Sequence, residues 1–109
     1  MAFSHRQFYQ NQSGRVAHNL NFNGPSVTRR TVVLVTAAPC DVDSGGPIFD
    51  PNIRLNVHGP DVRVSNIVPH GPEGGPATGG VEFVLTVDSP TDIAVTITLL
   101  EPWENFGIQ

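Results

Sequence analysis

Apolar and polar side chains alternate over the last third of the chain. The apolar positions are Val81, Phe83, Leu85 and Val87, followed by Ile93, Val95, Ile97 and Leu99. Successive side chains of a β-strand point to opposite faces, so this spacing predicts two half-buried strands. Residues 88–92, Asp-Ser-Pro-Thr-Asp, are typical of a turn. The pattern therefore predicts a β-hairpin of 81–87 and 93–99, with Val84 and Ala94 on its outer face.

Weaker alternation predicts further strands upstream. Residues 53–57 and 62–64 are expected to form a second hairpin, joined by a turn at 58–61. The apolar phase is lost near Asn66, which predicts a β-bulge or a strand with both faces covered.

Two more strands are expected nearer the N-terminus. The apolar run within 27–36 predicts a central strand buried on both sides. A weaker strand is indicated by Val16, His18, Leu20 and Phe22.

Strands of this number in 109 residues, with ten prolines and eleven glycines, predict a single all-β domain. We expect an antiparallel β-sandwich of six to eight strands, immunoglobulin-like or jelly-roll-like, over residues 16–100. An N-terminal polar and aromatic arm, 1–15, and a C-terminal aromatic tail, 101–109, flank it.

Charge and composition exclude several classes of partner. The net charge is −4 and all six positive residues are arginines, with only Arg29 and Arg30 adjacent, so no nucleic-acid surface is expected. No apolar run is long enough to span a bilayer and no signal peptide is recognisable. Cys40 is the single cysteine, which excludes an internal disulfide. A virion or an extracellular surface is the favoured location.

Residues 36–47, TAAPCDVDSGGP, resemble two signatures of chymotrypsin-like serine proteases placed side by side. The departures fall on catalytic positions. Pro39 occupies the place of the histidine base, and Val42 that of a glycine two residues before Ser44. A serine without a base is barely nucleophilic, so the stretch is interpreted as a turn. With no lysine and no phosphate-binding loop, we expect no enzymatic activity.

The same stretch offers oxygen ligands for a cation. The candidates are Asp41, Asp43, the carbonyl of Gly45, and Asp50. This spacing suits Ca²⁺, although Asn52 stands where a bidentate glutamate would complete a loop. The alternative is that the aspartates cap turns. No other cofactor is expected, because His58 and His70 lie too far apart to share a zinc ion within one chain.

Aromatic side chains concentrate near the two ends of the chain. They are Phe3, Phe8, Tyr9, Trp103 and Phe106. Both ends are expected to be held in place, either by their own domain or by a neighbouring subunit. Trp103 between two glutamates also leaves carbohydrate contact open.

These features predict a non-enzymatic structural subunit that acts by protein–protein association. It would form a homo-oligomer or join a larger assembly, of the virion decoration, tail or surface-layer type. The alternative is a Ca²⁺-dependent or carbohydrate-binding module.

Overall fold

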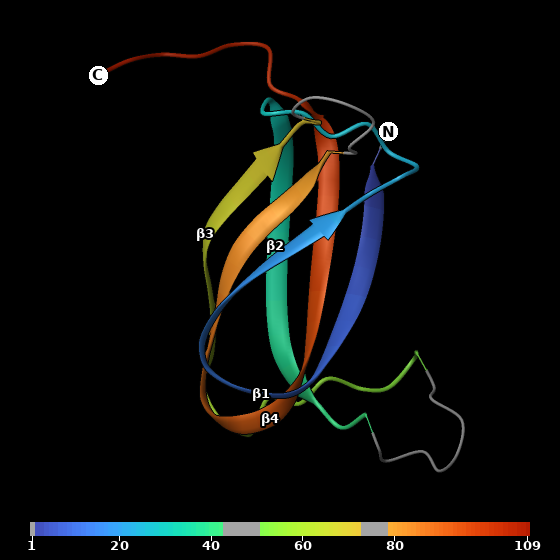
Figure 1. Ribbon diagram of the computed structural model, residues 1–109, viewed down its shortest axis with the longest axis vertical. Helices are drawn as coiled ribbons and strands as arrows, with labels where there is room; N and C mark the ends of the chain where they lie inside the picture. The colour runs from blue at the N-terminus through green and yellow to red at the C-terminus, as the bar shows by residue number, and fades with distance from the viewer. Residues whose placement is uncertain (1, 43–50, 73–78) are drawn as a thin grey trace.

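The computed structural model describes residues 2–42, 51–72 and 79–109. Four strands form one open antiparallel sheet: β1 Phe3–Asn21, β2 Thr31–Cys40, β3 Val62–His70 and β4 Gly80–Pro102 (Figure 1). The predicted all-β class is confirmed. The described residues show four long strands in one sheet, and not a sandwich of six to eight strands.

Strand β4 is the centre of the sheet and pairs with all three other strands. Its first part, 80–87, lies between the second part of β1 and strand β3. Its second part, 93–99, lies between the first part of β1 and strand β2. The predicted hairpin of 81–87 with 93–99 is therefore wrong, because each half takes its hydrogen-bonded neighbours from elsewhere in the chain.

Both long strands turn a corner at the same level of the sheet. In β1 the register shifts between Tyr9 and Gly14, where Asn11 and Gly14 adopt φ values of 52° and 73°. In β4 the corner spans 88–92 and contains Pro90, which cannot donate to a ladder. Figure 1 shows both strands folding over at this end. The two halves of the sheet consequently face each other, and β2 packs across from β3.

The core fills the space between the two halves. All eight alternating residues of β4 that the sequence singles out are buried, as predicted, and they form one cluster with Phe22 and Val27. Each such side chain stabilises the fold by about 1.5–3 kcal/mol relative to exposure. Val84 and Ala94, predicted to face outward, are also buried, because strands flank β4 on both sides.

Strand β2 differs from its prediction. It pairs only with β4, so it is an edge strand and not a central strand buried on both faces. Leu34 on its outer side remains 56% exposed. Pro39 fits this edge, since a proline interrupts the ladder on a strand that needs partners on one side only.

The second predicted hairpin is only half present. Residues 62–70 form β3, but 53–57 form no strand. The Asn56 N–H instead donates a hydrogen bond to the carbonyl oxygen of Pro39, with an N–O distance of 2.8 Å. The bulge near Asn66 is confirmed, because Asn66 has a φ of 51° and the register with β4 shifts between Ser65 and Val68.

One carboxylate ties the corner together. The side chain of Asp92 accepts hydrogen bonds from the backbone N–H of Asn11, at 2.9 Å, and of Val42, at 3.2 Å. These donors belong to the corner of β1 and to the second residue after the end of β2. A single side chain of β4 therefore holds both of its neighbours at the point where the sheet folds over.

Replacing Asp92 with alanine should lower the free energy of unfolding by about 1–2 kcal/mol, because two backbone donors lose a charged acceptor. Urea unfolding measures the loss. Asp88→Ala, an exposed aspartate at the same corner, is the matched control and should change stability little. Equal effects of the two substitutions would contradict the role assigned to Asp92.

Gly80→Ala should destabilise the fold by about 1–3 kcal/mol, the usual cost of overpacking. A Cβ at this position would collide with the carbonyl oxygen of Leu20 and with Asn21 in the adjacent β1. Gly24→Ala is the control, since nothing lies within 4 Å of a Cβ there. Thermal unfolding compares the two variants, and a Gly80 variant as stable as the control would be inconsistent with this close approach.

Candidate interaction site

Three of the five aromatic residues predicted at an interface lie toward one end of the molecule. Phe3 begins β1, while Trp103 and Phe106 follow the end of β4. Antiparallel pairing places these two strand ends side by side, with Phe3 opposite Leu99. We call the surface formed by the start of β1, the 24–26 loop and the end of β4 the open end of the sheet.

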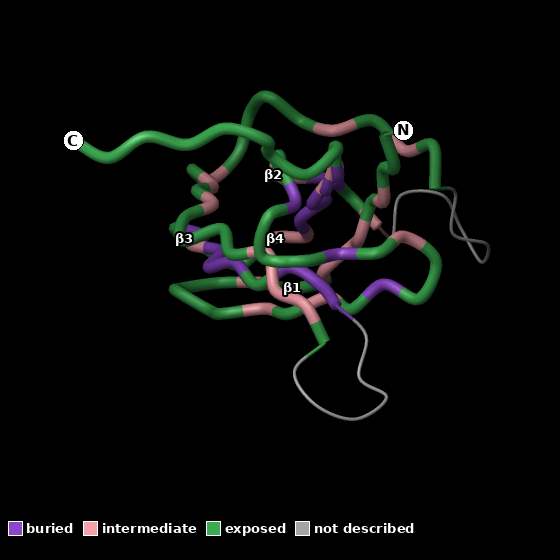
Figure 2. Tube along the Cα trace, turned by 90° about the horizontal axis from the view of Figure 1, so that it is seen from above, coloured by how far each residue is buried: buried purple, intermediate pink, exposed green. Residues whose placement is uncertain are grey.

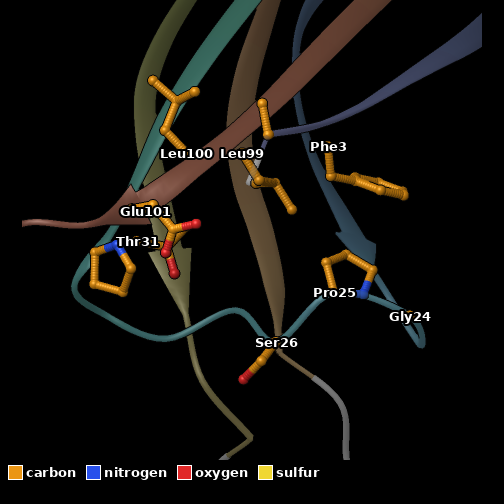
Figure 3. A pocket seen from close by; sticks show the side chains of 10 residues that line it. Phe3, Gly24, Pro25, Ser26, Thr31, Leu99, Leu100 and Glu101 are labelled. Atoms are coloured by element: carbon orange, nitrogen blue, oxygen red, sulfur yellow. The ribbon is translucent and has the colours of Figure 1, made fainter.

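A cavity of about 440 Å³ is hollowed into the open end (Figure 3). Its walls come from the start of β1, the 24–26 loop, the first residue of β2 and residues 99–102 of β4. Leucine, phenylalanine and proline side chains supply most of the lining, and Glu101 is its one charged residue. The cavity is within the size range of pockets that hold a small ligand or a few side chains.

Phe3 forms one wall of this cavity. Its ring packs edge-on against Phe22, with centroids 5.8 Å apart, and Phe22 belongs to the core. Phe3 nevertheless remains 39% exposed. In Figure 3 its ring lies beside Pro25, over the hollow. Phe3 thus connects the cavity to the core.

The tail, residues 103–109, leaves the open end from a fixed point. The Trp103 N–H donates to the Arg30 carbonyl at 3.0 Å, and the Arg30 guanidinium donates to the Trp103 carbonyl at 2.9 Å. The guanidinium carbon also lies 4.3 Å from the centroid of the indole, a cation–π contact. Arg30 itself is held by a tight turn, in which its N–H donates to the hydroxyl of Thr28.

Beyond this clamp the tail is exposed along its whole length (Figure 2). The Phe106 ring packs edge-on against Trp103 at 5.9 Å but is still 78% exposed, and Ile108 is 90% exposed. Phe106 and Ile108 are therefore the most exposed large apolar side chains of the tail.

The other two aromatic residues lie away from the open end. Phe8 is partly buried on the outer side of β1, opposite Ala94. Tyr9 points inward, with its ring 4.2 Å from that of His18 and edge-on to Phe83. The Tyr9 hydroxyl is buried without a hydrogen-bond partner, and burial raises the pKa of the phenol. The chain itself therefore uses Tyr9 in packing.

His18 lies between Tyr9 and Phe83, where the two halves of β1 face each other. Its Nε2 is 3.2 Å from the side-chain oxygen of Gln12, and burial lowers the pKa of the imidazole below its ordinary 6.5. His18 therefore acts as a partly buried, titratable packing residue.

The predicted cation ligands are only partly described. Asp41 is exposed immediately after β2, while Asp43, Gly45 and Asp50 lie outside the described residues. Within 2–42, 51–72 and 79–109, no three histidine, cysteine or acidic side chains come together as a metal site. The Ca²⁺ site stays a prediction. The described chain also contains no helix long and apolar enough to cross a membrane.

Cys40 is buried at the end of β2. Burial, followed by the negative charges of Asp92 and Asp41, raises the pKa of its thiol. A thiol of this kind remains protonated at neutral pH and is a weak nucleophile.

Two features of the open end escaped the sequence analysis. One is the clamp by Arg30, which the sequence shows only as one of two adjacent arginines. The other is the cavity wall supplied by the 24–26 loop. A Gly-Pro-Ser loop before a strand indicates a turn, but the local sequence does not predict which distant strand ends this loop will contact.

The depressed pKa of His18 predicts a pH-dependent stability. Because the unfolded chain binds this proton more tightly than the folded chain, the His18 contribution is complete above pH 6.5 and is lost as the pH falls toward the lower folded value. Urea unfolding at about pH 7.5 and about pH 5 measures how much the free energy of unfolding falls between these two pH values. This fall should be smaller for His18→Phe than for the unsubstituted protein. His58→Gln, at an exposed histidine, is the control and should retain the full loss, whereas an unchanged loss in His18→Phe would refute the assignment.

Comparisons with known proteins give no family for this chain. No family model matches it, and searches of curated proteins and of solved structures find no significant similarity. The role of the open end must therefore be inferred from its own residues.

Proposed function

We propose that this chain is a non-enzymatic assembly subunit that acts by protein–protein association through the open end of its sheet. The observation that carries the proposal is the tail, in which Phe106 and Ile108 project into solvent from a rigidly clamped base. A clamped base orders the exit of the segment, and so reduces the entropy that binding must overcome. Uncovered apolar side chains beyond it favour association.

The outer face of the adjoining half-sheet extends this apolar surface. Val32 lies opposite Leu100, and Leu34 lies opposite Thr98. All three aliphatic side chains are exposed, and Leu100 also lines the cavity. The tail, the cavity and the outer side of β2 therefore form neighbouring parts of one apolar region, as the core of an interface requires.

The outer face of the other half-sheet has a different character. Arg15 and Arg63 both flank Thr86, and Glu82 lies opposite Asn19. These charged side chains are exposed. Charged residues are depleted at the centre of protein interfaces, so this half is suited to solvent. The half that carries Val32 and Leu34 also presents Arg6, which donates to the hydroxyl of Thr96, so the two halves differ in degree of charge.

The kind of assembly proposed is a homo-oligomer or a larger structure of the virion decoration, tail or surface-layer type, in which the chain is an accessory component. The sheet supplies a rigid body, and the open end supplies the contact. Carbohydrate binding through Trp103 is less well supported, because the Arg30 guanidinium covers one face of the indole on which a sugar would stack.

The double substitution Phe106→Ser with Ile108→Ser should weaken self-association or partner binding at least about tenfold. At protein concentrations low enough for both proteins to be monomeric, the unfolding midpoint should stay the same, because the tail contributes little to the core. Light scattering and sedimentation over a range of concentrations measure the change. Val57→Ser is the matched control, since Val57 is 88% exposed but lies in the loop before β3. A strictly monomeric protein whose tail is cleaved by protease as fast as a free peptide would contradict the proposal.

A further inference from the structure

We infer that the partner at the open end is a second copy of this chain, and that the two copies exchange tails, each filling the cavity of the other. This inference rests on the proposed function and specifies its contact. The occupant is thus residues 103–109 of one copy, and the receptor is the cavity walled by Phe3, the 24–26 loop and residues 99–102 of the other.

The first argument is the position of the tail relative to the cavity. Glu101 and Pro102 line the cavity, and the tail begins at the next residue. A two-fold axis close to Pro102 would therefore place the tail of each copy beside the cavity of the other. An extended chain advances about 3.3 Å per residue, so Phe106 can reach roughly 13 Å and Ile108 roughly 20 Å from Pro102. This reach spans a cavity of the observed size.

The second argument is the direction in which the tail leaves. One backbone hydrogen bond, a second from the Arg30 guanidinium and the cation–π contact of Arg30 hold Trp103. Figure 1 shows the chain running outward from this clamp, away from the sheet. To enter its own cavity, the tail would have to reverse direction within the few residues after Trp103 and break the clamp. Entry into a second copy keeps the clamp intact.

The third argument is chemical fit. The tail presents apolar side chains at Phe106 and Ile108, which alternate with Asn105, Gly107 and Gln109. An extended segment with this alternation buries one side and leaves the other in water. The cavity offers leucine, proline and phenylalanine walls for the buried side, and the hydroxyl of Ser26 at its rim. Gly107 carries no side chain that could obstruct the approach.

The fourth argument is the area that the exchange would bury. An aromatic side chain buries about 150–250 Å². Two tails, each burying Phe106 and Ile108 against walls of similar area, remove on the order of 1,000 Å² from water. Contacts along Glu104 and Asn105 and between the exposed outer strands add to this. Specific association begins at about 1,000–1,200 Å², so reciprocal exchange reaches that range whereas a single tail does not.

Cysteine trapping tests the exchange directly. In a Cys40→Ala background, Ser26→Cys at the cavity rim and Gln109→Cys at the end of the tail leave Phe106 and Ile108 unchanged. A mixture of ¹⁴N- and ¹⁵N-labelled protein is oxidised mildly, and the cross-linked peptides are identified by mass spectrometry. We expect disulfides between residues 26 and 109 that join light to heavy chains, because exchange brings these positions within bonding range. The variant lacking Ser26→Cys is the control and should give no such species.

Blocking the cavity gives an independent test. Ser26→Trp should fill it and weaken dimer formation at least about tenfold, as measured by sedimentation, while leaving the unfolding midpoint of the dilute monomer unchanged. Ser65→Trp, on the exposed outer side of β3, is the control and should leave the dimer intact. If the tail binds this cavity, Phe106→Ser should add little further loss to Ser26→Trp, because both remove the same contact.

The outcomes separate the two proposals. A 26–109 disulfide within one chain would overturn the exchange, since the tail would then close on its own cavity. An oligomer that persists without the interchain disulfide would also overturn it, and would leave association through another surface, such as the edge of β2. A strict monomer with no binding partner would overturn the exchange together with the proposed function.

Discussion

The structure depends on one central strand that buries two apolar faces in opposite halves of the same sheet. Strand β4 carries four inward apolar side chains before its corner, including Phe83, and four inward aliphatic side chains after it. A flat sheet would leave both sets in water. Folding the sheet at residues 88–92 brings them together, and β1 must turn at the same level to stay paired. Asp92, which holds backbone groups of both neighbouring segments, lies at the position where this coupling is needed.

Folding one sheet onto itself leaves strand edges and strand ends that a closed barrel would not have. Strands β2 and β3 pair on one side only, and prolines interrupt both of them. Such prolines discourage pairing with other chains along an edge. The open end has no comparable protection. There the cavity, the exposed Leu100 beside it and the clamped tail lie together, and this is the surface to which we assign the proposed association.

The described titratable groups with shifted pKa values lie away from the cavity at the open end. His18 and Tyr9 face each other in the interior, where burial shifts both of their pKa values toward the neutral forms. Cys40 is buried beside carboxylates that disfavour its thiolate. The cavity, by contrast, is lined by apolar groups, two hydroxyl side chains and one carboxylate. The cavity is thus suited to apolar packing, whereas Tyr9, His18 and Cys40 contribute to the interior.

The sequence by itself determined the strand class and the inward residues of β4, and it marked an irregularity near Asn66 that the structure shows to be a bulge. These are local properties, because period-2 alternation and the loss of phase can be read within a few residues. The interface predicted from the aromatic residues Phe3, Phe8, Tyr9, Trp103 and Phe106 stays a prediction, and only the first and the last two of these lie at the open end. Only the tertiary structure decided which segments pair. The turn residues at 88–92 are equally compatible with a hairpin and with a corner, and the choice depends on whether β1 and β3 satisfy the first half of β4 better than its own second half does. The cavity and the Arg30 clamp were undetectable for the same reason, since both join residues roughly seventy positions apart or more along the chain, and no local pattern encodes such a meeting.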